Sequence, residues 1–344
     1  MNPFALYIII SSLALGTIST LSSYHWILAW IGLEINTLAI IPLMTKTPHP
    51  RAIEAATKYF LTQAAASALI LFASTINAWL TGEWAINTQI SPAPSILLSI
   101  ALCMKLGIAP FHFWLPEVLQ GLTLQTGLIL STWQKIAPMA LIIQLSQSVN
   151  LNLMLTLGLL STMVGGWGGI NQTQIRKVLA FSSIAHLGWM IAILKISPEL
   201  TLMNFLLYIL MTSTLFMTFM SLNTKNIYEL STAWSKSPTL SALSLLSLLS
   251  LSGLPPLTGF IPKWLIAQEM IKQDLTMFAL VILLSTLLSL FFYLRLTYTM
   301  SLTLAPNLSN STYQWFFSKN NMMATPISLS LLLLPVTPTI MVLI

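Results

Sequence analysis

The sequence predicts an all-α, polytopic integral membrane protein. Its 344 residues are 56% hydrophobic and only 6% charged, whereas a soluble globular domain carries roughly 25% charged residues. A helix needs about 20 apolar residues to cross a hydrocarbon core of roughly 30 Å. Long stretches hold no Lys, Arg, Asp or Glu: 1–33, 59–82, 84–104, 136–175, 200–224, 237–262, 275–294, 296–318 and 320–344. These stretches supply the spans, and the longest holds more than one helix.

The N-terminus is expected to stay in the membrane as the first span. Residues 1–4 form no basic region, and the first arginine is Arg51. A cleaved signal peptide begins with a basic region, and a transit peptide is rich in arginine. We therefore expect neither.

Eleven transmembrane helices are predicted. They lie at 3–22, 24–44, 52–80, 95–117, 123–146, 149–170, 177–196, 200–222, 238–271, 275–304 and 324–344. Lys and Arg favour the inner side of a membrane. The inner loops hold Lys46, Arg51, Arg176, Lys177, Lys225, Lys236 and Lys319, and the outer loops hold Glu83, Lys195, Glu199, Lys272 and Asp274. This asymmetry predicts the N-terminus inside and the C-terminus outside.

Two segments are expected at the inner surface. Segment 224–236 is polar with interspersed apolar residues, so we expect it to lie along the interface with Trp234 as an anchor. Segment 305–322 is rich in Asn, Ser and Thr and is predicted to be a loop.

Two spans are predicted to be interrupted. The fourth contains Leu-Gly-Ile-Ala-Pro-Phe-His over 106–112, and the ninth contains Gly-Leu-Pro-Pro-Leu-Thr-Gly-Phe-Ile-Pro-Lys over 253–263. Proline removes a backbone donor and disfavours helix in the residue before it. Freed carbonyls at membrane depth must face protein or water, so the breaks predict polar cavities. In the fifth span, Pro138 is expected to loosen the helix near Lys135.

The two breaks lie five spans apart, which predicts two related units of five helices. An odd number of spans per unit makes the units inverted repeats. We expect residues 1–147 to form the first repeat and 148–305 the second. Residues 306–344 then supply an inner loop and a C-terminal transmembrane helix within one integral membrane domain.

The glycine-rich run at 165–169, Gly-Gly-Trp-Gly-Gly, superficially resembles a nucleotide-binding loop. A strand should precede such a loop, and Asn171 occupies the position of its last glycine. Close helix packing through Gly165 and Gly169 is the better interpretation.

Four charged residues are functional candidates because they fall within predicted spans. Glu34, Lys105 and Lys135 lie near mid-depth, and Lys263 follows the second break. A charge there is costly unless it is paired or hydrated. We interpret these residues as a proton relay. Static ion pairing, snorkelling or, for Lys263, a place near the interface are the alternatives.

Glu34 and Lys105 form a candidate switch. At a separation of 5 Å and an effective dielectric of about 20, they would interact by about 3 kcal/mol. Desolvation favours the neutral amine and a nearby carboxylate favours the ammonium. A small movement therefore changes whether the lysine holds its proton.

Other polar residues in the spans have simpler interpretations. His112 and His186 could relay protons because imidazole titrates near neutral pH, although a single hydrogen-bonded histidine in a bundle is common. Lys58 and Arg295, near inner span ends, are expected to snorkel. Glu117 is expected to lie solvated near the inner surface.

Motifs for other chemistry are missing from the sequence. It holds no HExxH, glycine-rich phosphate loop, metal-ligand cluster or nucleophile elbow. The lone Cys103 excludes a disulfide framework, a thiolate zinc site and a cysteine-held iron–sulfur cluster within this chain. The net charge of +6 comes from scattered basic residues, so no nucleic acid is expected as a partner. We expect no cofactor and no metal in this chain, and we place any redox chemistry on another polypeptide.

Four motifs together are specific to one family. They are Trp-Ile-Gly-Leu-Glu-Ile-Asn over 30–36, Lys-Leu-Gly-Ile-Ala-Pro-Phe-His-Phe-Trp over 105–114, Trp-Gln-Lys-Ile-Ala-Pro over 133–138 and the run over 253–263. Through them the chain resembles, over its full length, the subunit 2 family of mitochondrial NADH:ubiquinone oxidoreductase, respiratory complex I, in its vertebrate form. That family belongs to the antiporter-like subunits.

The resemblance implies inverted five-helix repeats, each with a broken helix, and it implies site residues. Glu34 and Lys105 match the carboxylate–lysine pair of the family, Lys135 matches its central lysine, and Lys263 matches the lysine of the second broken helix. Family members of fourteen helices have three more at the N-terminus, which this chain lacks.

The resemblance also implies a function. The chain would translocate protons from the matrix to the intermembrane space as a subunit of the proton-translocating NADH:ubiquinone reductase, a multi-pass protein of the mitochondrial inner membrane. Its N-terminus would face the matrix and its C-terminus the intermembrane space. NADH, FMN, iron–sulfur clusters and ubiquinone would bind to other subunits. The expected partners are those subunits, including neighbouring antiporter-like ones, and the lipid bilayer.

Two other functions fit the same residues. Inverted repeats and broken helices equally permit an autonomous cation/proton antiporter. The third possibility is a structural membrane subunit, without its own proton path, whose charges are static pairs.

Overall fold

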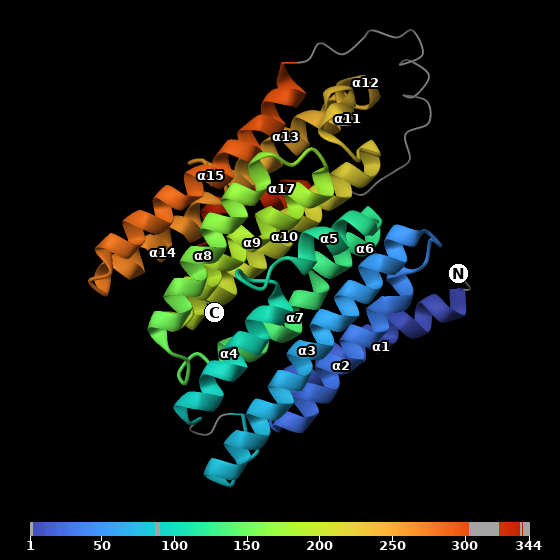
Figure 1. The fold of residues 1–344 in the computed structure, drawn as a ribbon. Coiled ribbons are helices and arrows are strands. Elements are labelled where there is room, and N and C mark those ends of the chain that lie inside the picture. The colour runs from blue at the N-terminus through green and yellow to red at the C-terminus, as the bar shows by residue number, and fades with distance from the viewer. Residues whose placement is uncertain (1–2, 87–89, 303–322, 338, 340–344) are drawn as a thin grey trace. The chain divides into compact units, whose positions relative to one another are not determined.

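A computed structural model describes the chain except for residues 1–2, 87–89, 303–322, 338 and 340–344 (Figure 1). In chain order its helices are α1 (Pro3–Ser22), α2 (Trp26–Met44), α3 (Pro50–Thr81), α4 (Pro92–Leu106), α5 (Trp114–Gly121), α6 (Leu124–Ser131), α7 (Trp133–Gln144), α8 (Leu151–Ile170), α9 (Ile175–Ile193), α10 (Pro198–Leu222), α11 (Ile227–Ser231), α12 (Ala233–Lys236), α13 (Pro238–Ser252), α14 (Phe260–Lys272), α15 (Thr276–Ser301) and α17 (Ala324–Leu332), with a 3₁₀ turn at Leu334–Val336. The all-α class is confirmed for the described part of the chain.

Several of these helices suit a bilayer. Within the described ranges, seven helical stretches are long and apolar enough to cross a membrane: α1, α2, α3, the stretch from Leu124 to Gln144 that joins α6 and α7, α8, α10 and α15. The chain is therefore built as a multi-span membrane protein.

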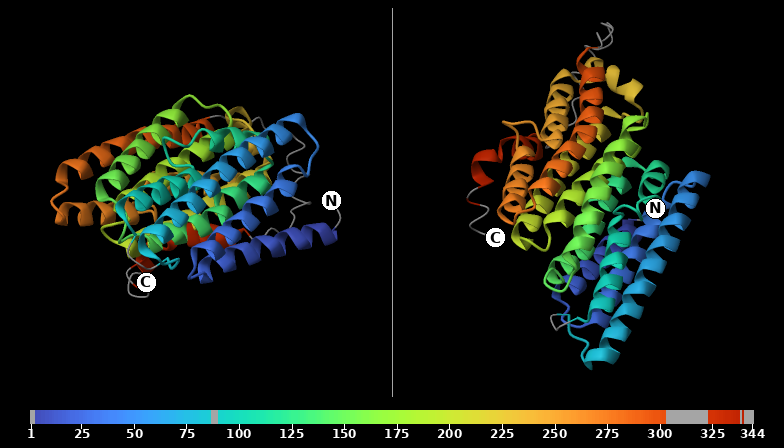
Figure 2. Two further views of the ribbon diagram at one scale, coloured as in Figure 1. Left: turned by 60° about the horizontal axis from the view of Figure 1, so that its bottom comes forward. Right: turned by 60° about the vertical axis from the view of Figure 1, so that its left-hand side comes forward.

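The chain folds as two compact units, Met1–Ser161 and Thr162–Ile344. In the first, α2 packs against α1 and α3, α3 packs against α4 and α5, and α7 packs against α4. In the second, α13 packs against α10, α15 and α17, while α9 packs against α10, α14 and α15. Figure 2 shows both sets of helices from two further directions.

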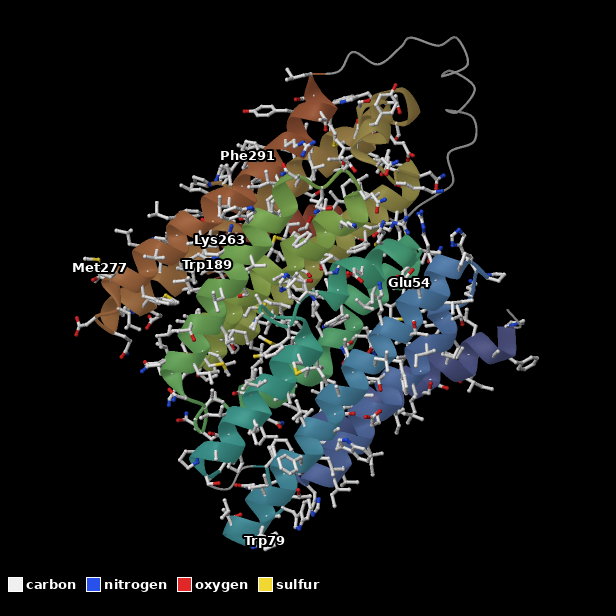
Figure 3. The ribbon with its side chains drawn as sticks, in the orientation of Figure 1. Glu54, Trp79, Trp189, Lys263, Met277 and Phe291 are labelled. Carbon is white, nitrogen blue, oxygen red and sulfur yellow. The ribbon has the colours of Figure 1, made fainter. Side chains whose placement is uncertain are left out.

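Helix α3 has one buried face along its length. Tyr59, Gln63, Ala66 and Ile70 are all buried, and they recur at the three- or four-residue spacing of one helical face. At 32 residues the helix is about 48 Å long, so it exceeds the hydrocarbon core of a bilayer. Figure 3 shows Glu54 and Trp79 near its opposite ends.

The two predicted interruptions are confirmed, and they share one construction. The half-helices α4 and α13 are each 15 residues long, and each begins with a proline after a serine. Each ends at a glycine in the left-handed region, Gly107 at φ 77° and Gly253 at φ 84°, a conformation that favours glycine. A cis X-Pro peptide, Ala109-Pro110 or Pro255-Pro256, follows each glycine before the next half-helix begins.

The charged residues occupy different positions in the two broken helices. Lys105 lies in the last turn of α4, two residues before Gly107. Lys263 lies in α14, ten residues after Gly253. The residue ten positions after Gly107 is Glu117, in the first turn of α5. The lysine therefore precedes the break in the first broken helix and follows it in the second.

The fifth predicted span is interrupted where no break was expected. Pro138 lies inside a continuous α7, whereas the helix is interrupted at Thr132. The Thr132 hydroxyl donates to Leu128 O at 2.7 Å, and the amide of Lys135 donates to Thr132 O at 3.2 Å. The interruption therefore lies three residues before Lys135, and both backbone and side-chain bonds of Thr132 span it.

The C-terminal span was predicted as one helix over 324–344. The structure instead ends α17 at Leu332 and has a short 3₁₀ turn that contains Pro335, because proline disfavours helix in the residue before it. The end of that predicted span, residues 340–344, and the predicted inner loop at 305–322 lie outside the described residues.

The segment at 224–236 forms two short helices, α11 and α12. The indole N–H of Trp234 donates to the carbonyl of Met300 at the end of α15. This tryptophan therefore attaches the segment to α15 by a hydrogen bond.

The glycine run at 165–169 packs helices closely, as predicted. A Cβ built on Gly165 would lie 2.6 Å from the backbone nitrogen of Ala185 in α9. A Cβ on Gly169 would lie 2.7 Å from the ring of Phe292 in α15. Only glycine lets α8 approach both helices this closely.

Candidate functional site

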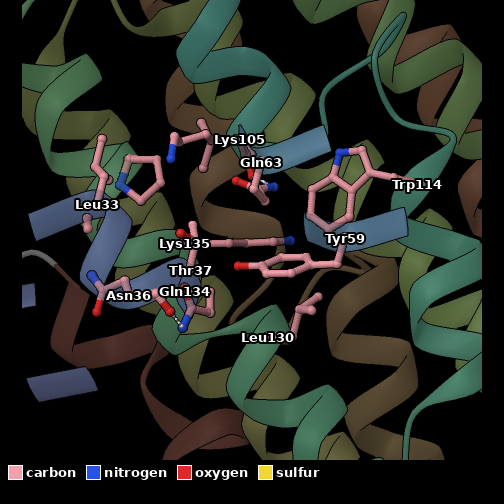
Figure 4. A pocket seen from close by; sticks show the side chains of 13 residues that line it. Leu33, Asn36, Thr37, Tyr59, Gln63, Lys105, Trp114, Leu130, Gln134 and Lys135 are labelled. Carbon is pink, nitrogen blue, oxygen red and sulfur yellow. Dashed lines mark hydrogen bonds between the residues drawn. The ribbon is translucent and has the colours of Figure 1, made fainter. Parts of the chain in front are cut away.

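A cavity with an empty volume of about 390 Å³ lies within the first unit. Four helices and the α6–α7 stretch supply its walls: Leu33, Asn36 and Thr37 from α2, Tyr59 and Gln63 from α3, Lys105 and Leu106 from α4, Trp114 from α5, and Leu130, Gln134, Lys135, Ala137 and Pro138 from α6 and α7. Figure 4 shows Tyr59, Gln63, Lys105 and Lys135 extending into this one space. The structure therefore brings two of the predicted relay lysines together.

Lys105 is held at the break of the first broken helix. Its residue exposure is 5%, and its Nζ has no hydrogen-bond partner in the part of the chain that the structure describes. Neighbouring helices satisfy the carbonyls that the break frees. Trp114 Nε1 donates to Met104 O at 3.1 Å, and Gln63 Nε2 donates to Lys105 O at 3.4 Å. The backbone around Lys105 is thus fixed while its ammonium faces the cavity.

Lys135 reaches the same cavity from α7 and is only 3% exposed. Its neighbour Gln134 donates through Nε2 to the carbonyl of Asn36 at 3.2 Å, which ties α7 to α2. Burying a lysine this completely in a bundle is costly, so Lys135 is a functional candidate.

Glu34 lies beside the cavity rather than in its wall. Its side chain is half-buried on α2, and among the described residues it forms no ion pair with Lys105. Thr37, one turn further along α2, lines the cavity. The Thr37 hydroxyl lies 3.2 Å from Glu34 Oε2 and 2.9 Å from Glu34 O. Thr37 therefore connects the carboxylate to the space that holds the lysines.

Tyr59 is the second hydroxyl group in the cavity, and its side chain is 2% exposed. Its ring meets the ring of Trp114 edge to face, with 5.7 Å between centroids. No hydrogen bond of its hydroxyl is found within the described ranges.

The two residues expected to snorkel, Lys58 and Arg295, make specific contacts. Lys58 Nζ lies 2.6 Å from Glu54 Oε1 and 2.6 Å from Glu117 Oε2, so Glu117 is paired. These side chains are 42%, 62% and 53% exposed, respectively. Arg295 Nη1 donates to the carbonyl of Ile170 at 2.7 Å, at the C-terminal end of α8. Glu117 is therefore both paired and exposed to solvent, in agreement with its expected position near the surface.

His112 lies in the first break and does not line the lysine cavity. It is 7% exposed, and its ring lies tilted by 33° against that of Phe113 with 4.3 Å between centroids. Its Nδ1 has no hydrogen-bond partner among the residues described.

A second cavity, with an empty volume of about 230 Å³, lies within the second unit. It is lined by Thr162, Ala185, His186, Trp189, Lys263, Thr286 and Ser289. Figure 3 labels Lys263 and Trp189 close together in this region. The structure therefore brings His186 and Lys263 together, as it does Lys105 and Lys135.

Lys263 is half-buried and lies across the break of the second broken helix. Its Nζ donates to the carbonyl of Ser252, the last residue of α13, at 2.7 Å. The contact depends on Gly253, because a Cβ there would lie 2.9 Å from Nζ. The negative end of the α13 dipole thus faces the ammonium.

His186 is 7% exposed and lies 3.4 Å from the hydroxyl of Tyr293 through Nε2. Trp189, on the same helix, is 2% exposed and its indole N–H has no acceptor in the described chain. This cavity is lined by polar side chains that can hold water.

Sequence reasoning missed Thr37, Tyr59 and Gln63. Each is an ordinary residue type in a transmembrane helix. One signal was available in the spacing: Thr37 follows Glu34 by three residues, and Tyr59 and Gln63 are four apart on one face of α3.

The sequence was compared with families of known proteins. Residues 23–289 match the family NADH:quinone oxidoreductase/Mrp antiporter, transmembrane, and residues 290–341 match the family NADH dehydrogenase subunit 2 C-terminus. The NADH-ubiquinone oxidoreductase chain 2 of Aquarana catesbeiana is 62% identical over 100% of both chains.

Solved structures with a similar fold come from related membrane complexes. A chain of respiratory complex I from Thermus thermophilus with bound aureothin has 27% identity and a TM-score of 0.83, covering 97% of this chain and 80% of that one. The Mrp complex from Dietzia sp. has the same fold at 17% identity, with a TM-score of 0.79 over 85% of this chain and 60% of its own. The chain therefore belongs to the NADH:quinone oxidoreductase/Mrp antiporter family and, within it, to the NADH-ubiquinone oxidoreductase chain 2 proteins.

Proposed function

We propose that this chain is a membrane subunit of respiratory complex I and moves protons from the mitochondrial matrix to the intermembrane space. The names of its full-length relatives and its likeness to a chain of a bacterial complex I support this assignment. Its partners are then the other subunits of the complex, including neighbouring antiporter-like subunits. Electron transfer from NADH to ubiquinone on those subunits supplies the free energy, and this chain carries no redox centre.

The relay consists of Glu34, Lys105, Lys135 and Lys263, with His112 and His186 as further candidates. The observation that carries the proposal is the first cavity, where Lys105 and Lys135 are 5% and 3% exposed and line one space. A lysine in such a site changes protonation when a neighbouring charge moves, because burial favours the neutral amine and a carboxylate favours the ammonium. Glu34, half-buried beside the cavity, is the carboxylate placed to do this.

The architecture follows from the same assignment. We propose eleven transmembrane helices, with residues 1–147 and 148–305 as inverted repeats and 306–344 as an inner loop and a final helix. The shared construction of the α4–α5 and α13–α14 breaks supports the repeat. The N-terminus then faces the matrix and the C-terminus the intermembrane space, in accordance with the distribution of Lys and Arg.

Replacing the buried lysines tests the function. In the assembled complex, Lys135→Met and Lys263→Met should each reduce proton pumping per NADH oxidised, while Lys46→Met, at an exposed loop position, should not. Pumping is measured in sealed membrane vesicles and normalised to the amount of intact complex on native gels. Unchanged pumping in both buried variants would refute the relay and favour a structural subunit.

The likeness to the Mrp complex favours a second candidate, an autonomous cation/proton antiporter. The purified chain in liposomes should then exchange protons for Na⁺ or K⁺ across the bilayer. Exchange that needs no NADH and no other subunit would support this second function.

A further inference from the structure

The first cavity contains two hydroxyl groups in addition to its lysines. Thr37 is 7% exposed, lines the cavity and lies 3.2 Å from Glu34 Oε2. Tyr59 is 2% exposed and lines the same cavity from the neighbouring helix α3. Glu34 itself does not line the cavity, so a proton that passes between Glu34 and the lysines needs an intermediate group.

Packing does not account for the Tyr59 hydroxyl. The edge-to-face contact with Trp114 involves only the ring, and a phenylalanine ring would make it equally well. The Tyr59 hydroxyl has no hydrogen bond to another described residue, and it is not among the fully enclosed polar atoms that lack a partner. Tyr59 lines the cavity that also holds Lys105 and Lys135 (Figure 4).

We propose that the hydroxyls of Thr37 and Tyr59 are relay groups that carry protons between Glu34 and the two lysines of the first cavity, together with water in that cavity. The inference rests on the proposed function and adds two residues to it.

The step balances at each oxygen. A hydroxyl has one proton to donate and lone pairs to accept another. A lysine ammonium first gives a proton through water to the Tyr59 oxygen. The original O–H bond of Tyr59 then breaks, and that proton leaves in the direction of Thr37. The proton released passes through water to Thr37, which in the same way donates its own proton to Glu34 Oε2. Both hydroxyls are neutral before and after, and the net change is one proton from lysine to carboxylate.

Two isosteric substitutions test the proposal in the assembled complex: Tyr59→Phe and Thr37→Val. Each removes one hydroxyl and keeps the shape of the side chain. The matched controls are Tyr298→Phe and Thr75→Val. Tyr298 lies on α15 and is 56% exposed. The Thr75 hydroxyl donates to Phe72 O on the exposed surface of α3. Lys135→Met runs in parallel as the test of the proposed function.

Proton pumping per assembled complex should fall about two- to tenfold in each cavity variant, as expected for one lost hydrogen bond along the path. The ratio of coupled turnover in H₂O to that in D₂O should rise above the parental ratio, because proton transfer then limits the rate. Both controls should match the parent in pumping and in isotope ratio.

Three results would overturn the proposal. If Tyr59→Phe and Thr37→Val pump like the parent while Lys135→Met does not, the relay uses other groups and the proposed function stands. If pumping falls without a change in isotope ratio, the hydroxyls have a structural role. If Lys135→Met also pumps normally, the proposed function fails and the inference fails with it.

Discussion

Replacing Gly253 with alanine should slow proton transfer through Lys263 while leaving the fold intact. The glycine adopts φ 84°, and its Cα faces the lysine side chain. A Cβ at this position would lie 2.9 Å from Lys263 Nζ and 3.0 Å from Cδ. The lysine must therefore retreat until its atoms reach ordinary contact, from 2.9 Å to at least 3.4 Å.

The structure separates two effects of this substitution. Alanine in the left-handed region costs about 1–2 kcal/mol of backbone strain. Displacing Lys263 also weakens its hydrogen bond to Ser252 O, which at 2.7 Å is a charge-assisted bond that contributes about 1.5–3 kcal/mol. Each 1.4 kcal/mol lost in the transition state for proton transfer lowers the rate by about tenfold.

Gly82 provides a matched control. It ends α3 at φ 76°, and nothing lies within 4 Å of a Cβ built there. Gly82→Ala therefore carries the backbone strain without moving a lysine.

The assay compares proton pumping and thermal stability of the two variants in the assembled complex. Both should lower the melting temperature, and only Gly253→Ala should pump more slowly. If the two variants pump equally well per assembled complex, the position of Lys263 over Gly253 has no role in proton transfer and the reasoning is refuted.

Two further predictions concern stability in the second unit. Gly165→Val should separate α8 from α9, because a Cβ at this position would lie 2.6 Å from the Ala185 backbone nitrogen, and overpacking costs about 1–3 kcal/mol. The yield of intact complex on native gels should fall. A normal yield would contradict the close packing of the two helices. Arg295→Met should leave the Ile170 carbonyl without its 2.7 Å hydrogen bond and destabilise the protein by about 1–3 kcal/mol, seen as a lower melting temperature, whereas an unchanged value would mean that water replaces the guanidinium.

The sequence predicts the interrupted helices well, because the signal there is local. Proline and glycine at 107–110 and 253–256 stop a helix for reasons within the backbone itself, and both breaks lie where the sequence placed them. A single proline is a weaker signal, and at Pro138 we expected only a loosening of the helix near Lys135. A helix can continue through a proline where the surrounding structure tolerates one lost backbone hydrogen bond. Here α7 continues through Pro138, and the interruption lies at Thr132.

The candidate site is predictable in part. Charge inside a span identifies Lys105, Lys135 and Lys263 without any knowledge of packing. Which side chains share a cavity depends on the rotation of each helix. Glu34 therefore proves half-buried and outside the cavity wall. Thr37 and Tyr59 have no charge to distinguish them from the other hydroxyl residues of the spans, so only their position in the fold identifies them.

The partner of Lys263 is a peptide carbonyl of the half-helix that precedes it. A carboxylate partner has its own protonation state and can release a lysine by accepting a proton. The Ser252 carbonyl has none, holds the same partial charge at every pH and survives any side-chain substitution at that residue. Because this partner does not titrate, the strength of the contact is set by the charge of Lys263 and by the geometry of the break between α13 and α14.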